Sequence, residues 1–231
     1  MKTPAPSRRP ERPPFAPPAG MPLGRLEWRT LLGWLRDDGL VVDEDAELVG
    51  KRLGAGDSTL HALVRLGGAG LSRAIGPGAG KALDTEALTE WLAGRCGLPY
   101  LRIDPLKADV GRVADVMSVH YAESRRALPI GFTLNEVTIA TAEPFDTGWV
   151  AEIESHLRRN VRLVVANPVD VRRYTTEFYA LARSVRAAQK TGEVATAASF
   201  EQLVESGKAN RALNANDQGV VQVVDWLWQY A

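Results

Sequence analysis

The chain has 231 residues, of which 45% are hydrophobic, and it carries 28 basic and 28 acidic side chains. This length predicts one or two modest domains, and the formal net charge of zero provides no global field that would attract nucleic acid. Cys96 is the only cysteine, so an intramolecular disulfide and a zinc site built from cysteines are both excluded.

Membrane-spanning and secretory segments are not evident. No hydrophobic run approaches the roughly 20 residues that a spanning helix needs, and the N-terminus lacks the apolar segment of a signal peptide. We therefore expect a cytoplasmic protein without direct membrane insertion, and we expect any membrane association to come through a partner.

The N-terminal segment is rich in proline, with eight of the 14 prolines between Met1 and Pro22. Such a segment buries too little apolar surface to offset the entropy of ordering it. The composition predicts a disordered tail over residues 1–24.

Helical patterns dominate the next region, residues 25–96. Hydrophobic residues recur at helical spacing near its start, at Trp28, Leu31, Leu32 and Leu35. Gly39 is a plausible stop, and Asp84 can cap a second helix through its carboxylate. We predict a helical subdomain with long loops here.

Short β-branched runs alternate with helical patterns beyond Gly97. The predicted strands lie at 99–103, at 128–133, around Val137 and Ile139, and at 161–166. The predicted helices start after Asp109, Ser118 and Asn167, the last with Pro168 at its first position. A further helix is predicted with Trp149, Ile153 and Leu157 on one face. Residues 97–182 therefore predict a small α+β sandwich in the order βαββαβα.

The C-terminal part is predicted to be a linker over residues 183–215, followed by the start of an apolar helix over 216–231. A helix this apolar needs a packing surface, because exposed it would promote aggregation. We expect either a partner or a continuation of the chain.

Several stretches resemble one family in a shared order: 97–105, 121–123, 128–130, 137–144 and 216–221. They are similar to the N-terminal domain of type II secretion and type IV pilus assembly ATPases, over roughly residues 25–182. The resemblance implies a non-catalytic docking and regulatory module. Its implied partners are the cytoplasmic part of an inner-membrane platform protein and the ATPase core of the parent protein, in a secretion or a pilus system.

One glycine-rich segment, residues 76–82, superficially resembles a phosphate-binding loop. Ile75 stands where that loop requires glycine, and Ala82 stands where it requires a hydroxyl for magnesium. We therefore expect no Walker motif and no ATPase activity. The resemblance to the motor ATPases implies that the missing motor core makes the hexamer, so we expect this chain alone to be a monomer or a weak dimer.

An alternative function is a cyclic di-GMP sensor. Some relatives bind this dinucleotide through tandem motifs in which Arg-Leu-Gly is followed by a leucine and a second glycine. One imperfect copy lies at 31–40, with Leu31 in place of the arginine, and Arg52-Leu53-Gly54 restores only the tripeptide. The dinucleotide candidates are Arg29, Leu32, Gly33, Leu35, Gly39 and Leu40. In the competing interpretation the leucines form a helix core and Gly33 allows close packing.

Other candidate sites are less specific. His61, His120 and His156 lack metal-ligand spacing, so we expect no metal site, and we interpret Cys96 as a small core hydrophobe. The acidic run 43–45 and the pair Arg158-Arg159 are interpreted as solvated helix ends that can also serve as rim charges of a docking surface.

Overall fold

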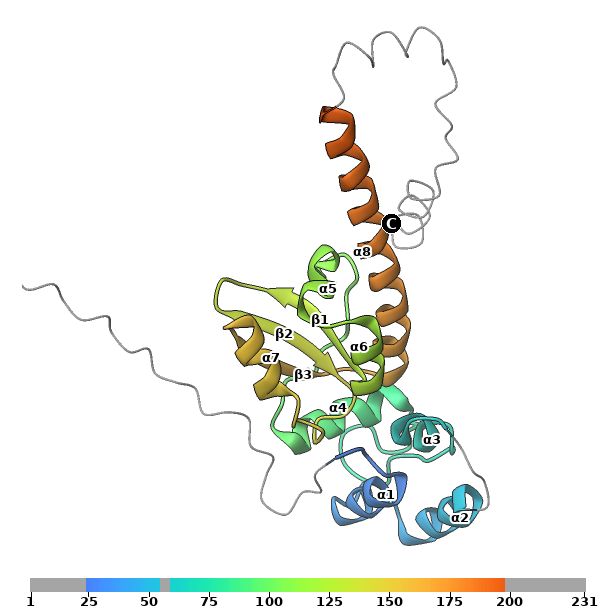
Figure 1. Cartoon of the computed structure of the whole chain (residues 1–231). Helices are drawn as coiled ribbons and strands as arrows, with labels where there is room; N and C mark the ends of the chain where they lie inside the picture. Colours follow the sequence, from blue (N-terminus) through green and yellow to red (C-terminus); the bar gives the residue numbers. More distant parts are fainter. Residues whose placement is uncertain (1–23, 55–58, 198–231) are drawn as a thin grey trace, which may run out of the picture.

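The computed structural model describes residues 24–54 and 59–197, which form a helical unit (24–96) and an α+β unit (97–197) (Figure 1). The predicted tail, except residue 24, lies outside the described residues. So do residues 198–215 of the predicted linker and the predicted helix at 216–231.

The helical unit contains four helices, which are α1 (Trp28–Asp37), α2 (Asp43–Gly54), α3 (Ala62–Gly67) and α4 (Thr85–Cys96). Leu31 and Leu35 of α1, Leu63 and Leu66 of α3, and Leu88 and Leu92 of α4 are fully buried in a shared core. Asp84 caps α4 as predicted, since its Oδ1 accepts a hydrogen bond from the Ala87 amide at 2.8 Å.

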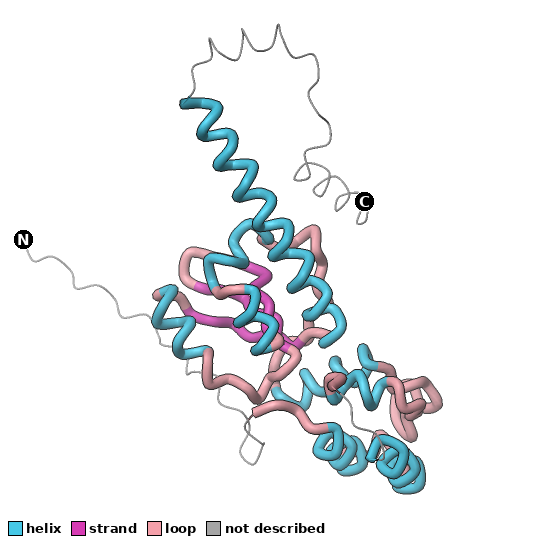
Figure 2. Tube along the Cα trace, turned by 45° about the vertical axis from the view of Figure 1, so that its right-hand side comes forward, coloured by secondary structure: helices cyan, strands magenta, loops and turns pink. Residues whose placement is uncertain are grey.

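The α+β unit contains a three-stranded sheet with strand order β1-β2-β3. Strand β1 (Ala127–Phe132) pairs antiparallel with β2 (Glu136–Thr141), which pairs in parallel with β3 (Asn160–Val165). The parallel pair is joined by α7 (Val150–Leu157), and Figures 1 and 2 show α7 and the long α8 (Pro168–Ala197) on either side of the sheet. The predicted α+β class is confirmed.

Three short helical segments precede β1, namely η1 (Val110–Arg112), α5 (Val113–Val116) and α6 (Val119–Arg125). Two predicted caps are confirmed. Ser118 Oγ accepts a hydrogen bond from the Tyr121 amide at 3.2 Å, and Asn167 Oδ1 accepts one from the Val169 amide at 3.0 Å.

Two predicted elements differ in the structure. Residues 99–103 form no strand of their own, because only Tyr100 makes a β-bridge, in parallel with Val165. Pro99 lacks an amide hydrogen and Asp104-Pro105 follows at once, which leaves too few residues for a ladder. Helix α8 continues to Ala197, so residues 183–197 of the predicted linker are helical, as their alanine content favours.

None of the helices among residues 24–54 and 59–197 combines the length and the hydrophobicity that crossing a membrane requires.

Candidate functional site

The two units meet at a junction built around the loop that follows β2. Phe145 lies in this loop, in the α+β unit, yet its side chain is buried in the core of the helical unit. Its ring packs edge-on against Trp34 of α1, with 5.7 Å between centroids. Because an aromatic ring from one unit completes the core of the other, the units pack as one body.

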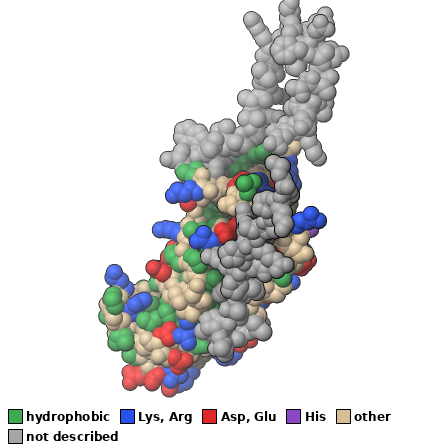
Figure 3. All heavy atoms as spheres, turned by 90° about the vertical axis from the view of Figure 1, so that its left-hand side faces the viewer, with side chains coloured by type: hydrophobic (Ala, Val, Ile, Leu, Met, Phe, Trp, Pro, Cys, Tyr) green, Lys and Arg blue, Asp and Glu red, His purple; other side chains and the backbone are tan. Residues whose placement is uncertain are grey.

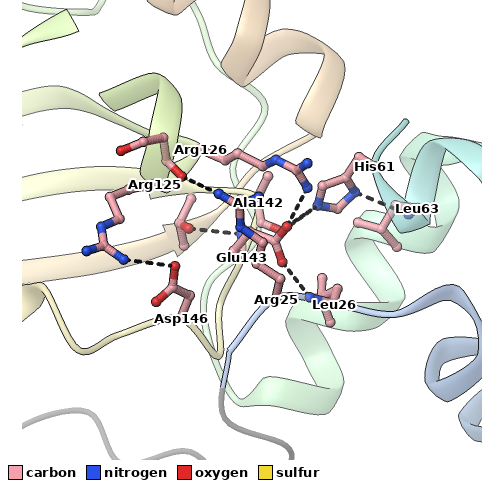
Figure 4. Close-up of polar contacts among 11 residues, drawn as sticks. Arg25, Leu26, His61, Leu63, Arg125, Arg126, Ala142, Glu143 and Asp146 are labelled. Atoms are coloured by element: carbon pink, nitrogen blue, oxygen red, sulfur yellow. Dashed lines mark hydrogen bonds and ion pairs between the residues drawn. The ribbon is translucent and has the colours of Figure 1, made fainter. Parts of the chain in front are cut away.

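Glu143 lies two residues before Phe145 and is the polar centre of the junction (Figure 4). Its Oε2 accepts a hydrogen bond from the Leu26 amide at 2.7 Å. Its Oε1 lies 2.6 Å from Arg126 Nη1 and 3.2 Å from His61 Nε2. Leu26 and His61 belong to the helical unit and Arg126 to the α+β unit, so one carboxylate ties both units together.

Local backbone structure places each partner of Glu143. His61 precedes α3 and caps it, because its Nδ1 accepts a hydrogen bond from the Leu63 amide. Nε2 therefore carries the ring proton, which it directs at Glu143 and at the Ala142 carbonyl oxygen, 3.2 Å away. Arg126 ends α6 in a left-handed conformation, with φ of 48°. The start of α3 and the end of α6 thus direct the His61 and Arg126 side chains at the same carboxylate.

Burial and charge oppose each other at Glu143, which is only 1% exposed. Burial alone would raise the pKa of its carboxyl group. Hydrogen bonds from His61 and the Leu26 amide, together with the charge of the Arg126 guanidinium, outweigh burial and hold the pKa below its ordinary value. The buried carboxylate is therefore ionised at neutral pH and depends on its partners for stability.

A pocket of about 420 Å³ opens beside this cluster, between the two units. Leu60, His61 and Val64 form its wall in the helical unit, and α6 and the first turns of α8 form the opposite wall. Arg172 lines it with an exposed side chain. The pocket has the size of a small-molecule site, but the described residues place no group of three or more metal-ligating side chains together.

The structure places the predicted dinucleotide residues on and just after α1. Leu32, Leu35 and Leu40 are buried in the core of the helical unit, while Gly33 has open space above its Cα and Gly39 closes the helix with φ of 67°. Arg29 is exposed and lies over the Trp28 ring, 4.6 Å from its centroid. Only Arg29 offers a surface side chain to a ligand, and the dinucleotide site stays a prediction.

A second arginine, Arg65, also lies over the Trp28 ring, and the sequence pattern did not single it out. Arg65 lies over the Trp28 ring at 5.4 Å and donates a hydrogen bond to the Leu53 carbonyl oxygen at 2.8 Å. The available signal was the tripeptide Arg65-Leu66-Gly67, which has the same Arg-Leu-Gly start as the motif considered above.

The structure arranges the segment that resembles a phosphate loop as a closed turn. Arg73 and Lys81 pair through their backbones, and Ser72 and Ala82 form an antiparallel bridge across its ends. Helix α4 begins only at Thr85, after its own cap. A strand running directly into a helix, which phosphate loops require, is not formed here.

The junction that ties the units together was also not predicted as a site. His61 was considered only as an isolated histidine, and Glu143 only as part of the run 137–144. No local pattern links them, because their contact depends on the packing of two units that are distant in sequence.

Comparison with known proteins finds one matching domain family and one similar pilus protein. A model of the MshEN domain matches residues 96–185. The type IV pilus assembly ATPase TfpB of Acinetobacter baylyi is 35% identical over 153 residues, which make up 65% of this chain and 26% of that protein. The chain thus spans about a quarter of the length of this relative.

Two solved structures each cover 67% of the chain. The structure of MshE with cdg has a TM-score of 0.43 and 18% identity, and covers 67% of this chain and 100% of that one. The N-terminal domain of XpsE has a TM-score of 0.40 and 15% identity, and covers 67% of this chain and 97% of that one. Residues 96–185 thus match the MshEN domain, and the chain is homologous to part of the type IV pilus assembly ATPase TfpB.

Proposed function

We propose that this chain is a non-catalytic docking and regulatory module of a pilus-assembly or type II secretion motor. It binds the cytoplasmic part of an inner-membrane platform protein through its helical unit, and it lies in the cytoplasm, peripheral to the inner membrane. The ATPase core of the parent protein is its second partner. Homology to a pilus assembly ATPase over about a quarter of that protein's length supports this role.

The observation that carries the proposal is the presence of exposed hydrophobic side chains on the helical unit. Leu48 on α2 is 61% exposed, and Val42 and Ile75 are also exposed. Acidic and basic side chains surround Leu48 on α2, as expected for the rim of a protein interface. Since the junction joins the helical unit firmly to the α+β unit, a partner bound on α2 also positions α8.

A matched pair of variants tests the docking face. Leu48 in the helical unit and Leu106 in the α+β unit are both 61% exposed, so aspartate at either position removes similar exposed apolar area. Leu48→Asp is expected to abolish capture of the chain by the immobilised cytoplasmic domain of the platform protein, and Leu106→Asp is expected to leave capture unchanged. Equal capture of both variants would place docking elsewhere.

The second candidate function is the binding of cyclic di-GMP, and one observation favours it. Arg29 and Arg65 both lie over the ring of the buried Trp28, so two guanidinium groups are together in the helical unit. Guanidinium groups bind phosphate and guanine through paired hydrogen bonds and stack on aromatic rings. A nucleotide that binds here would contact the two arginines.

Titration with cyclic di-GMP tests this candidate. Binding is expected to change the tryptophan fluorescence and release measurable heat, and Arg29→Ala is expected to weaken both signals. Arg183→Ala, which removes an exposed arginine of α8, is the control. Absence of heat and of a fluorescence change at high micromolar ligand would exclude the sensor function and leave docking untouched.

A further inference from the structure

An exposed basic surface lies at the end of the sheet where β1 turns into β2 and α7 into β3. The Asn160 amide donates a hydrogen bond to the Asn135 carbonyl oxygen at 2.9 Å, which holds the two turns side by side. This contact brings Leu134 next to the arginines that flank Asn160. We call Leu134, Arg158, Arg159 and Arg162 the sheet-tip surface.

The arginines of the sheet-tip surface have no acidic partner among the described residues. Arg158 and Arg162 are exposed and Arg159 is half-buried. The nearby Glu154 carboxylate accepts a hydrogen bond from the Val161 amide at 2.9 Å, and Glu136 lies opposite Asn160 in the sheet. Even when the negative charge of Glu136 is included, the three arginines give the sheet-tip surface a net positive charge.

Arg158 also adopts a strained backbone conformation. It ends α7 with φ of 53°, in the left-handed region that glycine adopts without cost. Arg126 is the other residue besides glycine, among those described, with positive φ. The ion pair with Glu143 explains an arginine at position 126, whereas the folded chain gives Arg158 no comparable contact. Its side chain is available for a partner outside the chain.

The sheet-tip surface also carries one exposed hydrophobic side chain, that of Leu134. Its side chain is 88% exposed, the largest exposure among the exposed large hydrophobic residues of the described chain. It stands alone, because the neighbouring Phe132, Leu157 and Val161 pack against the core. Protein interfaces are centred on contiguous buried anchors, which this surface lacks. A single protruding leucine among arginines suits the headgroup layer of a bilayer. The leucine can insert shallowly there, while the arginine side chains are attracted to the anionic lipids.

We infer that the sheet-tip surface binds an anionic phospholipid bilayer, with the arginines on lipid phosphates and Leu134 among the headgroups. This differs from the expectation that membrane contact comes only through a partner. The sheet-tip surface and α2 lie at opposite ends of the molecule (Figures 1 and 2). Basic and hydrophobic side chains intermingle on the face viewed in Figure 3. The inference does not depend on the proposed docking face, since the two surfaces do not overlap.

Sedimentation of the whole chain with phospholipid vesicles tests the inference. Binding to phosphatidylcholine vesicles that contain phosphatidylglycerol is expected, and it should weaken with added salt because screening shortens the range of the attraction. Each arginine near an anionic surface contributes about a fivefold increase in partitioning. The triple variant R158Q/R159Q/R162Q is therefore expected to bind about 100-fold more weakly, and Leu134→Ser about tenfold more weakly.

The control variant R102Q/K107Q/R183Q removes the same charge from exposed positions elsewhere, and it should bind like the wild type. Equal loss in both triple variants, or equal binding to vesicles without phosphatidylglycerol, would overturn the inference. If the tip variants bind vesicles normally but lose the platform protein in solution, the surface is a protein interface and the lipid assignment is wrong. Thermal unfolding of each variant verifies that it folds.

Discussion

The Glu143 carboxylate lies 3.2 Å from His61 Nε2, across the boundary between the α+β unit and the helical unit. Both side chains are buried, and Arg126 and the Leu26 amide complete the set of partners. This contact and the insertion of Phe145 fix how the helical unit sits on the sheet.

Removing the carboxylate should destabilise the protein. Glu143→Ala is expected to lower the free energy of unfolding by about 3 kcal/mol, because it leaves a buried amide and a partly buried guanidinium without their acceptor. Urea unfolding followed by circular dichroism measures the change. The exposed Glu123 on α6 serves as the control, and Glu123→Ala should change stability by less than about 0.5 kcal/mol. Similar losses in both variants would contradict the role of Glu143.

The same carboxylate predicts a dependence of stability on pH. The pKa of Glu143 is lowered in the folded protein from its ordinary value of 4.5, so its contribution is fully present above that value and is lost as the pH falls through the folded-state pKa. The stability difference between wild type and Glu143→Gln should therefore be largest near about pH 7 and shrink toward about pH 3. A difference that grows on acidification would show that the pKa is raised instead.

Cys96 should be chemically inert in the folded protein. Its side chain is buried, and burial raises the pKa of its thiol to about 12 despite the opposing charge of Arg95. Because the thiolate is the reactive form, a maleimide reagent at about pH 8 should label the chain only after denaturant is added. The denatured chain is the positive control, and rapid labelling without denaturant would contradict the burial of Cys96.

Trp149 should tolerate loss of its indole nitrogen but not of its ring. The side chain is buried, and its Nε1 has no hydrogen-bond partner among the described residues. Trp149→Phe keeps most of the packing and removes an unsatisfied donor, so its cost should be under about 1.5 kcal/mol. Trp149→Ala should cost about 3 to 5 kcal/mol. Thermal unfolding measures both, and equal losses would mean that Nε1 has a partner in solution.

Close packing of α3 against α4 requires a glycine at position 67. A Cβ there would lie 2.5 Å from the Thr85 amide nitrogen, so Gly67→Ala must displace the start of α4 and should cost about 1 to 3 kcal/mol. A Cβ on Gly33 in α1 would have no neighbouring atom within 4 Å, and Gly33→Ala should stabilise the protein by up to about 1 kcal/mol. If Gly67→Ala and Gly33→Ala shifted the melting temperature in the same direction, the close approach of position 67 to Thr85 would be contradicted.

Local chemistry in the sequence was enough to predict most of the elements. The caps at Asp84, Ser118 and Asn167 act within three residues of themselves, so their effect is visible without the fold. The strand pair around Ile139 follows from β-branched alternation and a short turn. The predictions were wrong at two places. At 99–103 the pairing of a strand depends on distant contacts, and at 183–197 the end of a helix depends on weak intrinsic preference.

By itself, the sequence determined the α+β class, the helical region before it and the resemblance to motor ATPases, because short-range periodicity, capping and shared motifs carry that information. Only the tertiary structure decided that Glu143 meets His61, that Phe145 completes the helical core, and that the turn at Asn135 lies beside Asn160. These residues are far apart in the chain or separated by a whole helix, and nothing in their immediate neighbours indicates the contact. The side chains at the junction become buried and paired only when the two units pack together. Local sequence patterns therefore do not reveal these contacts.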